Sequence, residues 1–212
     1  MEMIDTAFKK RQCPVKFDVS FGGFDGTQYC TVTVYDDVYR FWISDAMGDL
    51  FGSMLDIIYA LNIEFNDPKT DHTIEHILDD PENPYRITEL KADTLWDSEG
   101  TDMRWTFSRK LDNNDKQIVD VEMNFDFNEI KKYKIELPDL NYAVSRAVTD
   151  ILKKSGFCGY HFSTNFDYIN IVNFLMLKNL SLTGRALNFS YYDDGCRSSV
   201  LKDEIDLLLF DM

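Results

Sequence analysis

The sequence predicts an α+β fold, with an antiparallel meander sheet of about five to seven strands and two or three helices packed on one face. Two observations support this prediction. Several short segments alternate apolar and polar residues, which is the period of a half-buried strand. Other, longer segments repeat their apolar residues with the period of an amphipathic helix. The chain of 212 residues is expected to form a single domain.

The N-terminal region is predicted to form a hairpin. Two groups of apolar residues alternate with polar ones: Phe17, Val19 and Phe21, followed by Cys30, Val32 and Val34. Residues 22–28 lie between the groups, and their glycines have the wrong spacing for a dinucleotide-binding loop. We therefore interpret these glycines as turn residues.

A helix is predicted next, over residues 45–61. Its apolar residues recur at i, i+3, i+4 and i+7, starting from Met47, Leu50 and Phe51. Ser44 is a suitable N-cap, and Asp45 suits the positive end of the helix dipole.

Residues 66–85 are predicted to be a variable acidic excursion from the fold. Three prolines bracket a short helix that is expected over residues 71–78. Within this helix, His72, Glu75 and His76 spell H-x-x-E-H, the inverted zinc-protease motif. Both imidazoles would then face one zinc ion, and Glu75 would be the general base.

The surroundings of this motif favour a different interpretation. The helix is short, and Ile74, Ile77 and Leu78 would form its buried stripe. His72 and Glu75 would then face solvent. We therefore expect no cofactor and no metal, and we keep the zinc site as an alternative.

A meander of three strands is predicted to follow. Polar turns at residues 97–102 and 111–116 separate three segments of alternating residues. Trp96 and Trp105 flank the first turn and are expected to pack in the core. An aromatic interaction surface is the alternative for these two residues.

The C-terminal part of the chain is predicted to contain two helices and a tail. The helices are expected over residues 139–154 and 167–178. The tail, residues 181–212, is treated as an appendage whose packing the sequence leaves open. It contains a hairpin signal after residue 187, and its last residues, 201–212, fit either a short helix or an edge strand.

The charge of the chain limits its partners. The chain has 37 acidic and 22 basic residues, a net charge of −15. This charge disfavours nucleic acid and anionic membranes and favours a basic protein partner.

The sequence predicts a cytoplasmic protein. It has four cysteines without a C-x-x-C motif, a charged N-terminus and no long apolar run.

Three stretches resemble a known group of proteins: "ISDAMGDLFGSMLDIIYAL", "WDSEGTDMRWTFSRKLDNNDKQIVDVEMNF" and "LPDLNYAVSRAVTDILKKSGFCGYHFSTNFDYINIVNFL". Their order is similar to that in a diffuse group of small, uncharacterised bacterial α+β proteins, some of which resemble immunity proteins of polymorphic toxin systems. The resemblance covers residues 15–178. It departs from the group where Glu99, instead of a proline, precedes Gly100. It implies a bacterial binding protein and no catalytic residue.

The predicted function is therefore a non-enzymatic, acidic binding protein that occludes a basic toxin or effector, as an immunity protein does. The candidate binding residues are acidic: Asp36, Asp37, Asp79, Asp80 and Glu82. One alternative is a small zinc-dependent hydrolase that uses His72, Glu75 and His76. A second alternative is a structural or assembly subunit that self-associates through an aromatic surface. The sequence leaves the oligomeric state open.

Overall fold

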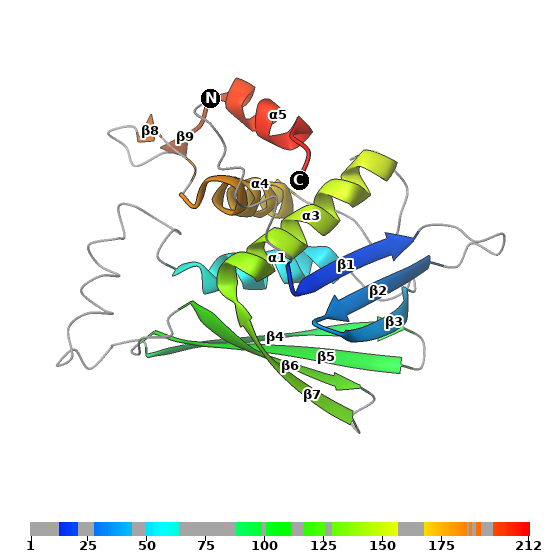
Figure 1. Ribbon diagram of the computed structural model, residues 1–212. Coiled ribbons are helices and arrows are strands. Elements are labelled where there is room, and N and C mark those ends of the chain that lie inside the picture. The colour runs from blue at the N-terminus through cyan, green and yellow to red at the C-terminus, as the bar shows by residue number, and fades with distance from the viewer. Residues whose placement is uncertain are drawn as a thin grey trace.

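The computed structural model describes residues 13–20, 28–43, 50–63, 88–98, 101–111, 117–125, 129–156, 168–185, 187, 190–191 and 197–212. Two antiparallel sheets, of three and four strands, and four helices make up most of this part of the chain (Figure 1). The predicted α+β class is confirmed. Strands β1 to β7 are divided between these two sheets, and β8 and β9 form a separate pair, whereas the sequence patterns indicated one main sheet.

The three-stranded sheet contains β1 (Val15–Ser20), β2 (Gln28–Val34) and β3 (Asp37–Ile43), in that order. β1 and β2 form the predicted hairpin, whereas β3 was not predicted as a strand. The buried residues of this sheet occupy alternate positions: Val15, Phe17, Val19, Cys30, Val32, Val34 and Phe41. The sheet therefore turns one apolar face inward.

The four-stranded sheet is a meander of β4 (Glu89–Ser98), β5 (Thr101–Lys110), β6 (Ile118–Phe125) and β7 (Glu129–Glu136). It contains the predicted three-stranded meander and adds β7, which was not predicted. Its inward face in the first three strands has two buried polar residues, Thr94 and Arg109. The other buried residues there are apolar: Trp96, Met103, Trp105, Phe107, Val119, Val121 and Met123.

The described side chains on the outward face of the four-stranded sheet are balanced in charge. The strand register places five acidic and five basic residues among the described side chains of this face: Glu89, Asp93, Asp120, Glu122 and Glu136, with Lys91, Arg104, Lys110, Lys132 and Lys134. Glu122 lies 2.9 Å from Lys132, and Asp120 lies 4.0 Å from Lys134. The described side chains of this face therefore do not form an acidic surface.

The two tryptophans predicted for the core are buried there. The ring centroids of Trp96 and Trp105 are 5.2 Å apart, and Phe17 of β1 lies 6.0 Å from Trp105. Phe51 of the first helix contacts Phe17 edge-on at 6.0 Å. This confirms the core interpretation and removes both tryptophans from any surface for self-association.

Three helices and the three-stranded sheet lie on the same side of the four-stranded sheet (Figure 1). The helices are α1 (Leu50–Leu61), α3 (Leu137–Ser155) and α4 (Tyr168–Thr183). The described parts of α1 and α3 lie close to their predicted ranges, whereas α4 continues beyond its predicted end at residue 178. The predicted apolar face of α1 is buried at Phe51, Met54, Leu55, Ile58 and Leu61. None of the described helices has the length and apolar character needed to cross a membrane.

A buried polar cluster fixes the C-terminal end of α1. The guanidinium of Arg109 donates a hydrogen bond to the carbonyl of Leu61. The side chains of Asn62 and Asn141 exchange two hydrogen bonds of 2.8 and 2.9 Å, and Asn62 also donates to Ile58 O at 2.7 Å. Carbonyls at a helix end have no partner within the helix, so these contacts satisfy them and tie α1 to β5 and α3.

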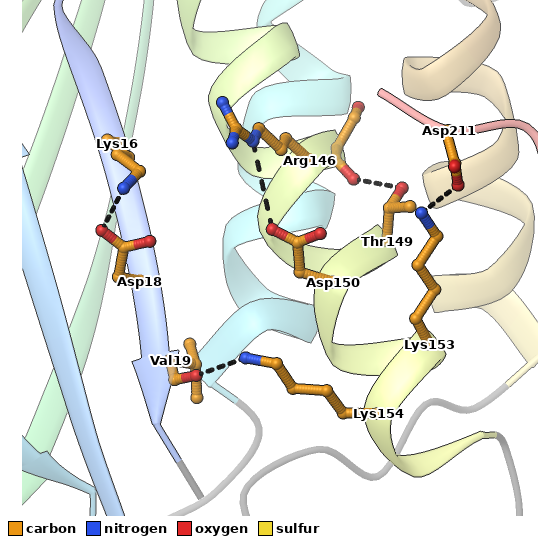
Figure 2. A network of polar contacts seen from close by, with 10 residues as sticks. Lys16, Asp18, Val19, Arg146, Thr149, Asp150, Lys153, Lys154 and Asp211 are labelled. Carbon is orange, nitrogen blue, oxygen red and sulfur yellow. Dashed lines mark hydrogen bonds and ion pairs between the residues drawn. The ribbon is translucent and has the colours of Figure 1, made fainter.

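The C-terminal tail contains the short strands β8 (Ser190–Tyr191) and β9 (Arg197–Ser198) and the helix α5 (Leu201–Leu209). The choice that the sequence left open for the last residues is therefore settled as a helix. Figure 2 shows that two adjacent lysines of α3 point to different parts of the fold. Lys154 donates to Val19 O of β1 at 3.1 Å, and Lys153 pairs with Asp211 after α5.

Candidate functional site

The structure describes two of the five predicted binding residues. Asp36 lies in the turn between β2 and β3, Asp37 is the first residue of β3, and both are exposed. The other three, Asp79, Asp80 and Glu82, lie outside the described residues. The zinc motif of His72, Glu75 and His76 lies there too, so these predictions stay untested.

Asp37 belongs to a hydrogen-bonded group that joins the two sheets. The register places Asp37 and Tyr39 on the inward side of β3, and Tyr133 on the inward side of β7. The hydroxyl oxygens of Tyr39 and Tyr133 are 2.5 Å apart, and Tyr133 Oη donates to Asp37 Oδ2 at 2.8 Å. A phenol has one proton to donate, so Tyr133 accepts from Tyr39 and donates to Asp37.

Stacked aromatic rings support this group from inside the fold. Tyr39 stacks on Phe125 of β6 with ring centroids 4.9 Å apart, and Phe41 stacks on the same ring at 5.7 Å. Such contacts restrict the ring of Tyr39 to one orientation. The stacked rings therefore hold in place the hydrogen bonds that run from Tyr39 through Tyr133 to Asp37.

Tyr35 stands at the tip of the same hairpin in a strained conformation. Its φ of 54° lies in the left-handed region, which a residue with a side chain rarely adopts. Its amide donates to Pro14 O at 2.6 Å, and its hydroxyl donates to Lys134 O at 2.5 Å. Its ring centroid lies 6.4 Å from that of Tyr133. These contacts hold an aromatic residue that is 53% exposed beside the two tip carboxylates.

We refer to Tyr35, Asp36, Asp37, Tyr39 and Tyr133 as the tyrosine–carboxylate cluster. Burial, followed by the hydrogen bonds with Tyr39 and Asp37, raises the pKa of Tyr133 above its ordinary value. The phenol therefore stays protonated at neutral pH and works as a hydrogen-bond donor.

Lys131 lies on the same side of β7 as Tyr133. Its ammonium is 2.9 Å from Glu129, and the hydrogen bond to this carboxylate raises the pKa of Lys131. Its ion pair is with Glu129, and Asp37 lies within electrostatic range of the same ammonium.

The cluster has the groups needed to hold a cation that belongs to a partner. A carboxylate accepts charge-assisted hydrogen bonds from ammonium or guanidinium groups, and an exposed phenol ring attracts a cation to its face. Across the described part of the chain, no three His, Cys, Asp or Glu side chains are grouped as metal ligands would be.

Tyr133→Phe is expected to lower the free energy of unfolding by about 1 kcal/mol at pH 8, because it removes the shared hydrogen bonds to Tyr39 and Asp37. The folded-state pKa of Tyr133 is raised, so its stabilising contribution is present below about pH 10 and is lost as the pH rises further. The difference between wild type and variant should therefore shrink between pH 8 and pH 11. Urea unfolding at both pH values measures it, and a constant difference would contradict the hydrogen-bonded arrangement.

The sequence patterns did not reveal the three tyrosines of the cluster. One signal was available in β7, where Glu129, Lys131 and Tyr133 occupy inward positions that are apolar in the neighbouring strands. Polar residues at inward positions indicate that this part of the strand faces a polar contact instead of the core.

The fold and the cluster together define an α+β protein in which two antiparallel sheets meet at an exposed tyrosine–carboxylate edge. Comparisons with protein-family models, with curated proteins and with solved structures find no match for this chain.

Proposed function

We propose that this chain is a non-enzymatic binding protein for a basic protein partner, and that the tyrosine–carboxylate cluster is part of its contact surface. The observation that carries the proposal is the position of Asp36 and Asp37. Both residues are exposed at the hairpin tip and directly follow Tyr35, which is itself 53% exposed. Neither forms an ion pair among the described residues, whereas Asp120 and Glu122 on the sheet face lie beside lysines.

The distribution of charge along the sequence supports the same proposal. The described residues contain 18 acidic and 16 basic side chains. The full chain has 37 and 22, so the remaining residues contain 19 acidic and 6 basic ones. The described residues are thus nearly neutral, and most of the net negative charge belongs to the rest of the sequence. A charge of this size speeds the encounter with a basic partner.

The proposed mechanism is occlusion of a cationic surface. The tip carboxylates would accept hydrogen bonds from arginine or lysine side chains of the partner, and Tyr35 would cover one of these side chains with its ring. The Tyr39–Tyr133 chain holds Asp37 in one orientation, which reduces the entropy lost on binding. An immunity protein in the cytoplasm that neutralises a basic toxin domain is the function that fits this mechanism best.

Co-expression with the product of the adjacent gene tests the proposal. We expect a basic protein, with an isoelectric point above about 9, to copurify with the wild-type chain. Asp36→Asn/Asp37→Asn should reduce the amount that copurifies. Asp120→Asn/Glu122→Gln is the matched control, because it removes the same charge from the sheet face. The proposal fails if no basic protein copurifies, or if both variants retain the partner equally.

A further inference from the structure

The helix α5 is attached to the fold mainly through its C-terminal end. It lies against α4, on the side facing away from both sheets (Figure 1). The ammonium of Lys178, which is buried in α4, donates to Leu208 O at 3.1 Å and to Phe210 O at 2.7 Å. The pair of Lys153 and Asp211 fixes the same end (Figure 2). A cation at this position also suits the negative end of the helix dipole.

This attachment leaves one apolar side of α5 uncovered. No residue of α5 is buried, although Leu207 and Leu208 pack against the core. Leu201, Ile205 and Leu209 follow one another at i, i+4 and i+8, so they line one side of the helix. They are 68%, 45% and 72% exposed. We refer to these three residues as the α5 stripe.

The segment that contains the α5 stripe has more acidic than basic residues. Residues 201–212 contain one basic residue, Lys202, and four acidic ones: Asp203, Glu204, Asp206 and Asp211. Lys202 is already paired with Asp206 at 2.5 Å. Lys153 of α3 likewise pairs with Asp211, so Asp203 and Glu204 carry the remaining acidic charge beside the stripe.

The acidic residues of this segment indicate which kind of partner can cover the α5 stripe. A second copy would bring the same acidic segment and the same net charge of −15. In an antiparallel pair centred on Ile205, Glu204 of one copy would also lie opposite Asp206 of the other. An anionic membrane repels the segment for the same reason. A groove on another protein would match this segment better, because an apolar floor would contact the stripe and a basic rim would contact the acidic residues beside it.

We propose that α5 is a docking helix that inserts Leu201, Ile205 and Leu209 into an apolar, basic-rimmed groove on another protein. Helix-in-groove recognition uses apolar anchors one turn apart, as in this stripe. The proposal goes beyond the function proposed above and does not depend on it, because it uses neither the hairpin tip nor its carboxylates.

The test uses the full chain and a defined probe, a fluorescein-labelled 14-residue peptide of leucine and lysine that forms a basic amphipathic helix. Anisotropy titration should show binding to the wild-type chain. Leu201→Ser/Ile205→Ser/Leu209→Ser should weaken this binding by about tenfold or more, without changing the net charge. Leu95→Ser is the matched control, because it removes an exposed leucine from β4, and it should bind as wild type does.

Three results would overturn the proposal: equal affinity of the wild-type and stripe variants, loss of binding in the Leu95 control, or a wild-type dimer in sedimentation that the stripe variant lacks. The last result would assign the stripe to a second copy. Circular dichroism checks that the triple variant keeps its fold. If it unfolds, Leu209→Gln alone should still weaken binding severalfold, and wild-type affinity for this single variant would equally refute the proposal.

Discussion

Trp105→Ala is expected to lower the free energy of unfolding by about 3–5 kcal/mol. The indole is buried where both sheets and α1 meet, with Trp96, Phe17 and Phe107 around it at centroid distances of 5.2, 6.0 and 6.0 Å. Truncation would leave a cavity that residues from several elements would have to close together. Partial collapse is therefore expected to recover little of the lost packing.

Chemical denaturation of the wild-type and variant chains measures this effect. Leu95→Ala in the neighbouring strand is the control, because Leu95 is exposed, and it should change stability by less than about 0.5 kcal/mol. Trp105→Phe should cost less than the alanine variant. It keeps an aromatic ring and removes an indole N–H that has no hydrogen-bond partner among the described residues. A loss below about 1 kcal/mol for Trp105→Ala would mean that the two sheets do not pack as described.

Arg109→Ala is expected to have the next largest effect, a loss of about 3 kcal/mol or more. Arg109 is fully buried in β5, and its guanidinium donates to Leu61 O at the end of α1. Alanine would leave both a cavity and a buried carbonyl without its donor. Arg109→Met fills the cavity but provides no donor, so it should recover part of the loss.

Arg104→Ala is the control for this prediction, because Arg104 lies on the same strand but on its outward face. Thermal unfolding followed by circular dichroism distinguishes the variants. If Arg109→Met were as stable as wild type, the hydrogen bond to α1 would contribute nothing to stability, and the cap that we describe for this helix would be wrong.

The sequence predicted those elements whose two sides differ clearly in polarity. Strand β5 alternates apolar and polar residues over 103–108 and β6 over 119–125, and α1 has a continuous apolar side. In each case one face packs on the core and the other meets solvent, which is the situation that binary patterns reflect. The division of the strands into two sheets depends on contacts between distant segments, to which local periodicity is insensitive.

The two strands that were missed, β3 and β7, are those that form the candidate site. In β3, Asp37 and Tyr39 share the inward side with Phe41, while Val38 lies on the outward side. In β7, a tyrosine and charged residues occupy inward positions. Both strands reach the open edge between the sheets, where an inward side chain meets polar groups. Functional sites are often the places where local patterns fail in this way.

The site itself was predicted only in part. Net charge drew attention to Asp36 and Asp37, which the structure places at an exposed tip. The hydrogen bond between Asp37 and Tyr133 spans almost a hundred residues of sequence, and no local signal connects the two segments. The exposed side of α5 was missed because the alternatives left open for residues 201–212, helix or edge strand, give different sets of exposed residues.

The central claim is that the chain binds a basic protein through the tip of the β2–β3 hairpin. The most direct test is calorimetric titration of the copurified partner with the wild-type chain and with Asp36→Asn/Asp37→Asn, at low and at physiological ionic strength. We predict at least about tenfold weaker binding by the variant, and a wild-type affinity that falls as salt is added. Equal dissociation constants for the two chains, together with an affinity that salt does not change, would contradict the claim.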